Sequence, residues 1–471
     1  MKKSDKKGLF SLIIYTFGIV LFSVLFFRID SDYLWHIKAG EYIFKNGIVR
    51  YDIFSWVVNG KYWMSHEWLF EWFIYALKNI FGKFHLFIYC FGCSLVLALL
   101  LLFSNKKHYL KNYFFSVMWI SLFVFIIFFM QVRPHLISFI FIAITMYCLT
   151  DLYNNDKSKK IYFLPFVSIL WSNIHGGSSN LIYILPLIFI ISGMFQFRGS
   201  KIFSTKLSFI QLKKYIIVLL LCIVGICINI HGIKMFMYPY QNMMNTTMIN
   251  NILEWRSTSL NEPIHYLYYV FIIFVFSIMM VSKNKIRLLD LLIFVFCVYL
   301  GLKSIRFWFY SYIMMSYVIF NYVNNRGSDN GFRLGIFIYS ILFLILFIMR
   351  FYTVFNNKYE VLLTEKDISF LKKQNPKRLF NMYNYGGDLI YNGLLVFVDG
   401  RADLYSEHNI YKDYLSLSNL NGDVSLIFNK YNFDYFLVDS NYPINNYLLM
   451  NDKYRLIYSR DDIRIYKILN K

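Results

Sequence analysis

The chain has 471 residues, of which 58% are hydrophobic, 21% are aromatic and only 16% are charged. Its mean hydropathy is +0.47, and 48 Lys and Arg against 27 Asp and Glu give a formal charge of +21. This composition excludes a disordered chain, which would be rich in charge and poor in aromatic residues. It also argues against a soluble globular enzyme, because too few polar residues are present to cover the surface. We therefore expect a protein that crosses a membrane several times.

Apolar runs that could cross a bilayer, which takes about 20 residues, recur along the chain as far as residue 351. The first run follows four lysines and is not followed by a small-residue cleavage site, so we interpret it as a retained span and not as a signal peptide. We predict about eleven spans. They lie at residues 8–27, 84–103, 113–131, 136–150, 161–174, 179–197, 215–230, 266–282, 288–304, 305–323 and 334–351.

The basic residues are distributed unevenly between the loops. If the N-terminus is cytoplasmic, the short cytoplasmic loops hold most of the Lys and Arg, which is the bias that orients membrane helices. This bias accounts for the charge without nucleic acid as a partner. An odd number of spans then places the C-terminus outside. We predict a multi-pass protein of the cell (plasma) membrane, with the lipid bilayer as its surroundings and a cytoplasmic N-terminus.

Two segments on the outer side are too long to be simple connections: residues 28–83, and the tail from residue 352. The tail combines strand-like runs at 394–398, 435–438 and 464–468 with helical patterns at 365–373, 408–418 and 422–430. We predict a mostly α fold. A polytopic transmembrane helical bundle would span residues 1–351, with 28–83 as a long first external loop, and a small extracytoplasmic α/β domain would span residues 352–471.

The first external loop is rich in carboxylates, indoles and imidazoles. Indole faces stack on sugar rings, and carboxylates hold hydroxyl groups, a cation or an acceptor proton, so this composition suits a saccharide site. Anchoring at the membrane interface is the competing interpretation of each Trp. A carboxylate beside the bilayer edge is costly in free energy unless it is paired or takes part in function, so Asp32 and Glu67 stand out among the acids. The candidate catalytic residues are Asp32 and Glu67, and the candidate binding residues are Trp35, His36, Asp52 and His66.

Further polar residues fall on the outer side in the predicted topology. They are Arg133, His135, His175, His231, Glu254 and Arg306. An Arg fork suits a phosphate or pyrophosphate clamp, although a helix break with a snorkelling Arg explains Arg133 equally well. The sequence Asp399-Gly400-Arg401 predicts a strand-to-turn corner with a surface ion pair, or alternatively a segment that lines the site.

The stretch Asp32–Tyr42, D-Y-L-W-H-I-K-A-G-E-Y, resembles the first external loop of the oligosaccharyltransferase catalytic subunit, D-P-W-F-N-Y-R-x-T-E-Y. The chain is more closely similar to a set of bacterial and archaeal membrane proteins related to the GT-C glycosyltransferases, with the pattern D-x-x-W-H, D-x-F-S and H-E-W-L. The matching residues are Asp32, Trp35, His36, Asp52, Phe54, Ser55, His66, Glu67, Trp68 and Leu69. Further matches are Arg133–His135, Trp171–Gly177, Asn229–Gly232, Glu254, Trp255, Arg306, Tyr385–Leu389 and Val398–Tyr405, so the resemblance covers nearly the whole chain.

The resemblance implies a GT-C-type membrane glycosyltransferase. Such an enzyme takes a sugar from a polyprenyl-phosphate or pyrophosphate carrier and places it on a glycan, lipid or protein acceptor of the cell envelope. Asp32 would be the base or a metal-binding carboxylate, and Glu67 with His66 would orient the acceptor or a cation. Arg133, His175 and Arg306 would stabilise the phosphate that leaves. No definite cofactor is implied: a divalent cation, Mg²⁺ or Mn²⁺, is compatible with Asp32, but no ligand spacing indicates one.

Two other functions stay open. A transporter or flippase of a lipid-linked or polar solute would explain the spans but not the Trp- and carboxylate-rich loop, and the sequence lacks paired Gly/Pro-interrupted helices in two matching halves. A non-catalytic envelope-assembly protein would instead bind cell-envelope polymer through its tail.

Overall fold

The computed structural model of the chain describes residues 29–104, 131–323 and 362–469, together with Trp119 and positions 9, 10, 12–14, 16–18, 20 and 21. The chain divides into two compact units. Unit 1 consists of Met1–Arg28 and Lys83–Lys358, and unit 2 consists of Ile29–Gly82 and Tyr359–Lys471. Most of the loop 28–83 is therefore grouped with the C-terminal segment. The predicted domain boundary between residues 351 and 352 stays a prediction.

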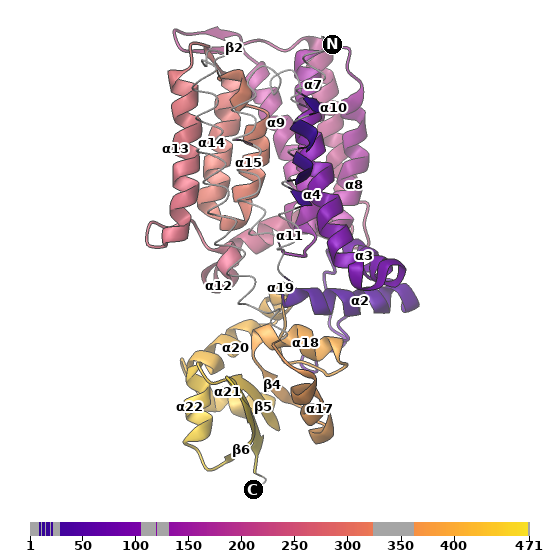
Figure 1. The fold of residues 1–471 in the computed structure, drawn as a ribbon, viewed down its shortest axis with the longest axis vertical. Coiled ribbons are helices and arrows are strands. Elements are labelled where there is room, and N and C mark those ends of the chain that lie inside the picture. The colour runs from indigo at the N-terminus through magenta and orange to yellow at the C-terminus, as the bar shows by residue number, and fades with distance from the viewer. Residues whose placement is uncertain are drawn as a thin grey trace. The chain divides into compact units, whose positions relative to one another are not determined.

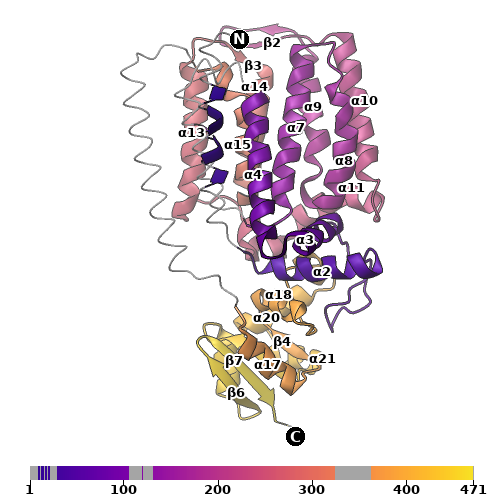
Figure 2. The same ribbon diagram turned by 45° about the vertical axis from the view of Figure 1, so that its right-hand side comes forward.

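Unit 1 is a bundle of helices. Its described helices are α4 (His85–Ser104), α7 (His135–Asn154), α8 (Leu164–Ile174), α9 (Leu181–Gly193), α10 (Phe209–Ile226), α11 (Ile233–Met244), α12 (Thr246–Asn251), α13 (Tyr266–Val281), α14 (Leu288–Lys303) and α15 (Trp308–Ser316). Helices α7 to α10 run side by side in both Figure 1 and Figure 2. A three-stranded sheet of β1 (Phe197–Arg198), β2 (Ile202–Ser204) and β3 (Ile286–Arg287) joins two of the loops.

Short 3₁₀ turns connect many of these helices and interrupt two of the predicted spans. They are η1 (Gly82–Phe84), η2 (Lys160–Phe163), η3 (Gly176–Ser178), η4 (Leu253–Trp255), η5 (Pro263–His265), η6 (Ile305–Phe307) and η7 (Ile319–Asn321). In the region predicted as a span at 305–323, η6 and η7 flank the nine-residue helix α15. The irregular backbone at η4 and η6 carries Glu254 and Arg306, and His175 directly precedes η3.

Several helices of the described residues could cross a membrane. By length and composition alone, five qualify: Trp68–Ser104, His135–Asn154, Gly176–Gly193, Phe209–Ile226 and Pro263–Val281. The predicted spans at 334–351 and, apart from Trp119 and Gln131, at 113–131 lie outside the described residues, and the span at 8–27 is described only at scattered positions. The number of spans stays a prediction, whereas the mostly helical fold with apolar helices is confirmed.

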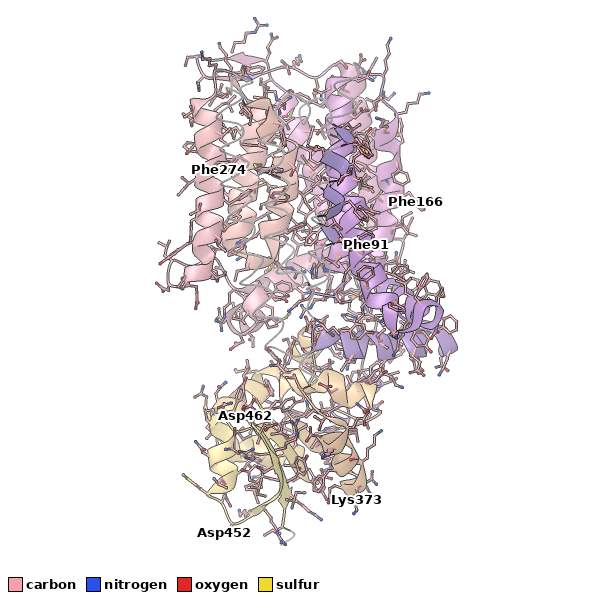
Figure 3. All side chains as sticks on the ribbon, in the orientation of Figure 1. Phe91, Phe166, Phe274, Lys373, Asp452 and Asp462 are labelled. Carbon is pink, nitrogen blue, oxygen red and sulfur yellow. The ribbon has the colours of Figure 1, made fainter. Side chains whose placement is uncertain are left out.

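The surfaces of the two units differ in polarity. On the helices of unit 1, large apolar side chains such as Leu220, Val270 and Phe166 are exposed, as expected of faces that meet lipid. Phe166 is labelled in Figure 3. The surface of unit 2 carries charged side chains, among them Lys373 and Asp452, both labelled in Figure 3. The two surfaces are therefore suited to different solvents.

Unit 2 contains a four-stranded sheet of β4 (Leu379–Asn381), β5 (Tyr435–Asp439), β6 (Tyr454–Arg460) and β7 (Ile463–Ile468), in the order β4-β5-β7-β6. Strand β4 is parallel to β5, and the other neighbours are antiparallel. The tail also forms α17 (Glu365–Gln374), η8 (Tyr383–Tyr385), α18 (Gly386–Tyr391), α19 (Ala402–Glu407), α20 (Ile410–Asn419), α21 (Val424–Tyr431) and α22 (Pro443–Leu449). Nearly all of β5 is buried, so it forms the core of this α/β sheet.

Local sequence signals account for most of these elements. A capping box starts α17, in which the Asp367 carboxylate accepts from the backbone N–H of Thr364 at 2.7 Å. The predicted helices at 365–373, 408–418 and 422–430 are confirmed as α17, α20 and α21, and the predicted strands at 435–438 and 464–468 as β5 and β7.

The predicted strand at 394–398 is wrong. Among these residues only Val396 pairs, through an isolated parallel bridge to Ser55. The Val396 N–H donates to the carbonyl of Phe54 at 3.0 Å, and its carbonyl accepts from the Trp56 N–H at 3.1 Å. The apolar run therefore pairs with the first loop and does not extend the sheet.

The first loop folds as two helices and a hairpin within unit 2. Helices α2 (Asp32–Asn46) and α3 (Trp68–Phe81) pack closely, because Gly40 has no side chain: a Cβ there would lie 2.0 Å from the carbonyl oxygen of Glu71. Between them, Tyr51 and Tyr62 form an antiparallel bridge around a turn at Gly60, where φ is +72°. The hairpin places Asp52 and the Trp residues that follow against the tail.

Candidate functional site

The first turn of α2 presents candidate residues on one face. Asp32, Trp35 and His36 are three and four residues apart, so they lie on neighbouring positions of the helix surface. The Asp30 carboxylate accepts from the backbone N–H of Asp32 at 3.0 Å, which fixes the start of the helix. The helix N-terminus also favours the negative charge of Asp32. The carboxylate therefore lies on a rigid element, at a helix end that favours negative charge.

The backbone of Gly400 packs directly against this helix turn. A Cβ at Gly400 would lie 1.8 Å from Asp32 Oδ1 and 2.8 Å from Trp35 Nε1, so any larger residue there must displace these side chains. The Trp35 side chain is buried, and its indole N–H has no acceptor among the described residues. A buried donor of this kind usually has a partner, which a bound ligand or water can supply.

A buried ion-pair network joins the first loop to the tail beside Gly400. The Arg401 guanidinium donates from Nη1 to Asp52 Oδ1 at 2.5 Å and from Nη2 to Asp399 Oδ2 at 2.6 Å. It also lies over the ring of Trp63, 4.6 Å from the centroid. Burial and the Asp399 carboxylate hold the pKa of the Tyr405 phenol well above its usual value, so this hydroxyl donates to Asp399.

The network corrects one expectation. The ion pair of Asp399 and Arg401 was expected on the surface, but both side chains are almost fully buried. The reason is that Asp52 of the first loop supplies a second carboxylate, which the local sequence of the tail cannot reveal. Asp52 itself is fully buried and paired with Arg401, so it holds the first loop to the tail; its role in substrate binding stays a prediction.

A second group of acids and imidazoles surrounds Glu67. His66 Nε2 lies 3.3 Å from Glu67 Oε1, and His36 Nε2 lies 3.7 Å from Glu67 Oε2. Asp403 Oδ2 lies 3.9 Å from His66 Nδ1. Burial opposes protonation of His66, but the carboxylates of Glu67 and Asp403 outweigh it and raise its pKa to about 9. His66 is therefore a cation at neutral pH, between two carboxylates.

Sequence reasoning missed several residues of these two groups. They are Glu71, Asp403 and Tyr405, whereas Asp399 and Arg401 were expected as an ion pair or as a segment lining the site. Glu71 could have been found, because it lies one helical turn after Glu67. Arg401 and Asp403 lie more than 300 residues from Asp52 and His66, their partners in the first loop, and no spacing rule connects them.

In unit 1, His175 and Arg306 come together beside a set of hydroxyl groups. Arg306 Nη2 lies 3.3 Å from His175 Nε2, and His175 Nδ1 lies 2.7 Å from Ser138 Oγ and 3.1 Å from Ser178 Oγ. Because Arg can only donate, Nε2 must be the acceptor and Nδ1 must carry the proton of a neutral ring. The guanidinium also lies over Trp255, 4.4 Å from the ring centroid. The cation is thus held in one orientation.

The other candidates of unit 1 are placed differently. Arg133 Nη1 donates to Glu254 Oε2 at 2.8 Å, so these two predicted binding residues form an ion pair. His135 begins α7 and packs edge-on against Phe139. The backbone N–H of His231 donates to the Asn229 side chain in the turn before α11. Their roles in binding stay predictions.

The described residues do not form an evident metal site. Among residues 29–104, 131–323 and 362–469, no group of three or more His, Cys, Asp or Glu side chains is arranged to hold a metal ion. The divalent cation considered for Asp32 stays a prediction.

Comparison with known proteins gives a likeness in structure but not in sequence. No protein-family model matches the chain, and no curated protein matches it. The crystal structure of the Archaeoglobus fulgidus oligosaccharyltransferase tethered to an acceptor peptide with the NVT sequon matches with a TM-score of 0.55 and 10% identity. The apo form of that enzyme matches with a TM-score of 0.51 and 10% identity, and each match covers 92% of this chain and 69% of the other. Over most of its length, this chain therefore shares the fold of the Archaeoglobus fulgidus oligosaccharyltransferase.

Proposed function

We propose that this chain is a membrane glycosyltransferase that moves a sugar from a polyprenyl-phosphate-type donor to a cell-envelope acceptor on the outer face of the cell membrane. One observation carries the proposal: a chain with the fold of an oligosaccharyltransferase holds a carboxylate, Asp32, on the first turn of a helix, beside a buried indole. The solved relative is tethered to an acceptor peptide, which supports an acceptor of the same general kind here.

In this proposal Asp32 activates the acceptor. The acceptor nucleophile forms a bond to the anomeric carbon of the sugar while the bond from that carbon to the carrier phosphate breaks, and the electron pair leaves with the phosphate. Asp32 takes the proton of the acceptor, and Glu67 holds the acceptor in place. The indole N–H of Trp35 can donate to an oxygen of the substrate.

The cluster at Arg306 is assigned to the phosphate of the donor. A guanidinium held over Trp255 and bound to a neutral His175 keeps its full charge and still has N–H groups for an anion. Such a preoriented cation stabilises the negative charge that the phosphate gains as it leaves. No step of the proposal passes through a metal ion.

Replacing Arg306 with Lys is expected to weaken donor use about 5- to 30-fold, because the loss of the stacked guanidinium costs about 1–2 kcal/mol while the charge is kept. The rate of sugar transfer in membranes, measured as a function of the lipid-linked sugar concentration, checks this as a rise in apparent KM. Arg256→Lys, an exchange at an exposed neighbour, is the matched control and should leave KM unchanged. Equal KM values for Arg306→Lys and Arg256→Lys would contradict the proposal that Arg306 binds the donor phosphate.

Replacing Gly400 with Ala is expected to lower the transfer rate about 10- to 100-fold, because the new methyl group must displace the Asp32 carboxylate. The rate per amount of folded protein in isolated membranes is the measurement. Gly92→Ala in α4, where a Cβ would have no neighbour within 4 Å, serves as the control. A Gly400→Ala variant with the wild-type rate would show that the position of Asp32 against Gly400 is irrelevant to transfer.

The proposed function itself is tested by comparing the lipid-linked sugars and envelope glycans of cells with and without this protein. We expect one carrier-linked sugar to accumulate in its absence and one envelope glycan to lose that sugar. If both pools are the same, the protein does not transfer sugar from such a donor. Movement of the intact lipid-linked sugar between the two membrane leaflets, without transfer, would support the flippase alternative.

A further inference from the structure

Glu67 lies between two imidazole rings, and each ring is backed by another carboxylate. Glu67 Oε1 faces His66 Nε2 at 3.3 Å, and Glu67 Oε2 faces His36 Nε2 at 3.7 Å. On the far side of the rings, Glu71 Oε1 lies 3.6 Å from His36 Nδ1, and Asp403 Oδ2 lies 3.9 Å from His66 Nδ1. We call His36, His66, Glu71 and Asp403 the Glu67 cradle. It alternates acids and imidazoles across α2, α3 and α19.

The alternation matches what each group can do in a hydrogen bond. Carboxylates only accept, and imidazole N–H groups donate, so every contact of the cradle can be a charge-assisted hydrogen bond. The four separations, 3.3–3.9 Å, are longer than an ideal hydrogen bond, and contacts between catalytic groups commonly tighten when a substrate binds. Both oxygens of Glu67 are engaged, so the carboxylate cannot rotate freely.

Burial gives the cradle a closed and an open end. The Glu71 and His36 side chains are only 1% and 3% exposed, whereas those of Glu67 and His66 are 13% and 19% exposed. The carboxylate oxygens of Glu71 have no hydrogen-bond partner among the described residues and lie closest to His36. Burying a carboxylate in this way costs free energy unless the carboxylate interacts with a neighbouring group. Here that group is the His36 ring, which also faces Glu67.

We propose that Glu71 and Asp403 are positioning residues: through His36 and His66 they fix the orientation of Glu67, the carboxylate that meets the acceptor. The proposal rests on the proposed function, in which Glu67 holds the acceptor. It also means that the C-terminal segment contributes an acid to a site that otherwise comes from the first loop. Asp403 lies on the first turn of α19, directly after the Gly400 backbone that packs against Asp32.

The alternative is that the cradle only stabilises the fold. The two interpretations differ in what an isosteric amide does. Asp403→Asn preserves size and packing but removes the charge that faces His66 Nδ1, while the backbone carbonyl of Met64 stays 3.2 Å from that nitrogen. If Asp403 has a positioning role, its replacement should change the protonation of the His66 ring and the transfer rate without a loss of folding.

The first readout needs no substrate. The full chain in detergent, labelled with ¹⁵N-histidine, is studied by NMR at pH 7, and the signals of the two rings are identified by their loss in His36→Gln and His66→Gln. We expect Asp403→Asn to shift the His66 ring signals towards those of a neutral imidazole, and Glu71→Gln to change those of His36. Asp452→Asn, at an exposed acid of the same unit, should change neither. Unchanged His66 and His36 signals in the two cradle variants would overturn the proposal.

The second readout is transfer from the extracted lipid-linked sugars of the host membrane. Asp403→Asn is expected to lower kcat about 10- to 100-fold with little change in KM for the donor, and Asp403→Glu should restore most of the rate and the His66 signals. If Asp403→Glu and Asp403→Asn lower the transfer rate equally, the effect is one of packing and the proposal fails. If the wild-type chain itself transfers no sugar, the proposed function fails, while the NMR experiment still decides whether Glu71 and Asp403 control the rings beside Glu67.

Discussion

Replacing Arg401 with Gln is expected to destabilise unit 2 by about 3–5 kcal/mol, because it leaves the buried carboxylates of Asp52 and Asp399 without their cation. Gln is close to Arg in the length of its apolar stem but cannot form the fork that binds both acids. The stacking on Trp63 is lost as well. The effect should be among the largest of any single polar substitution in the described part of unit 2, since Asp52 and Asp399 are fully buried.

Hydrogen exchange followed by mass spectrometry measures this loss locally in the full chain. Peptides covering 50–64 and 394–406 should exchange faster in Arg401→Gln, whereas those of β5 and β7 should change less. Arg455→Gln, at an exposed position of β6, removes the same charge from the same unit and should leave both segments protected. Wild-type protection of 50–64 in Arg401→Gln would show that the ion pair does not hold the first loop to the tail.

The sequence predicted those elements whose signals are local. Helix α17 has its capping box within four residues, and the core strand β5 is a continuous apolar run, so both were expected at nearly their observed positions. The run at 394–398 has the same apolar character as β5 but pairs with Ser55, which lies more than 300 residues earlier. An apolar run says nothing about its partner, so the pattern predicted a strand where only one residue forms a bridge to the first loop.

The candidate site shows the same difference between local signals, which the sequence reveals, and long-range contacts, which it does not. Asp32, His36 and Glu67 were chosen because their residue types and spacing within the first loop suit a saccharide site. Asp403 was not chosen, and the contact of Arg401 with Asp52 was not foreseen, because both contacts join the tail to that loop and leave no signal among neighbours in the sequence. Sequence reasoning therefore named the part of the candidate site that is continuous in the chain, and the structure added the contacts from the tail.

Replacing Asp32 with Asn is expected to lower sugar transfer about 10²- to 10⁴-fold, because an amide of the same shape cannot take the proton of the acceptor. Folding should be nearly unaffected: the side chain is half-buried on the first turn of α2, and the lost interaction with the helix dipole costs at most about 1 kcal/mol. The measurement is the transfer rate in membranes, normalised to the amount of inserted protein. Glu41→Gln, on the same helix but paired with Lys38 and Lys45 instead, should keep the wild-type rate.

Asp32→Glu separates the chemistry of this carboxylate from its position. It restores an acid of similar basicity but adds a methylene where Gly400 already leaves no room for a single further carbon beside Asp32 Oδ1. If Asp32 acts as a base in a fixed position, the Glu variant should remain at least about tenfold slower than the wild type, since a displacement of about 1 Å is enough to cost that much. A Glu variant as fast as the wild type would mean that charge alone is required, and a fast Asn variant would remove Asp32 from the reaction.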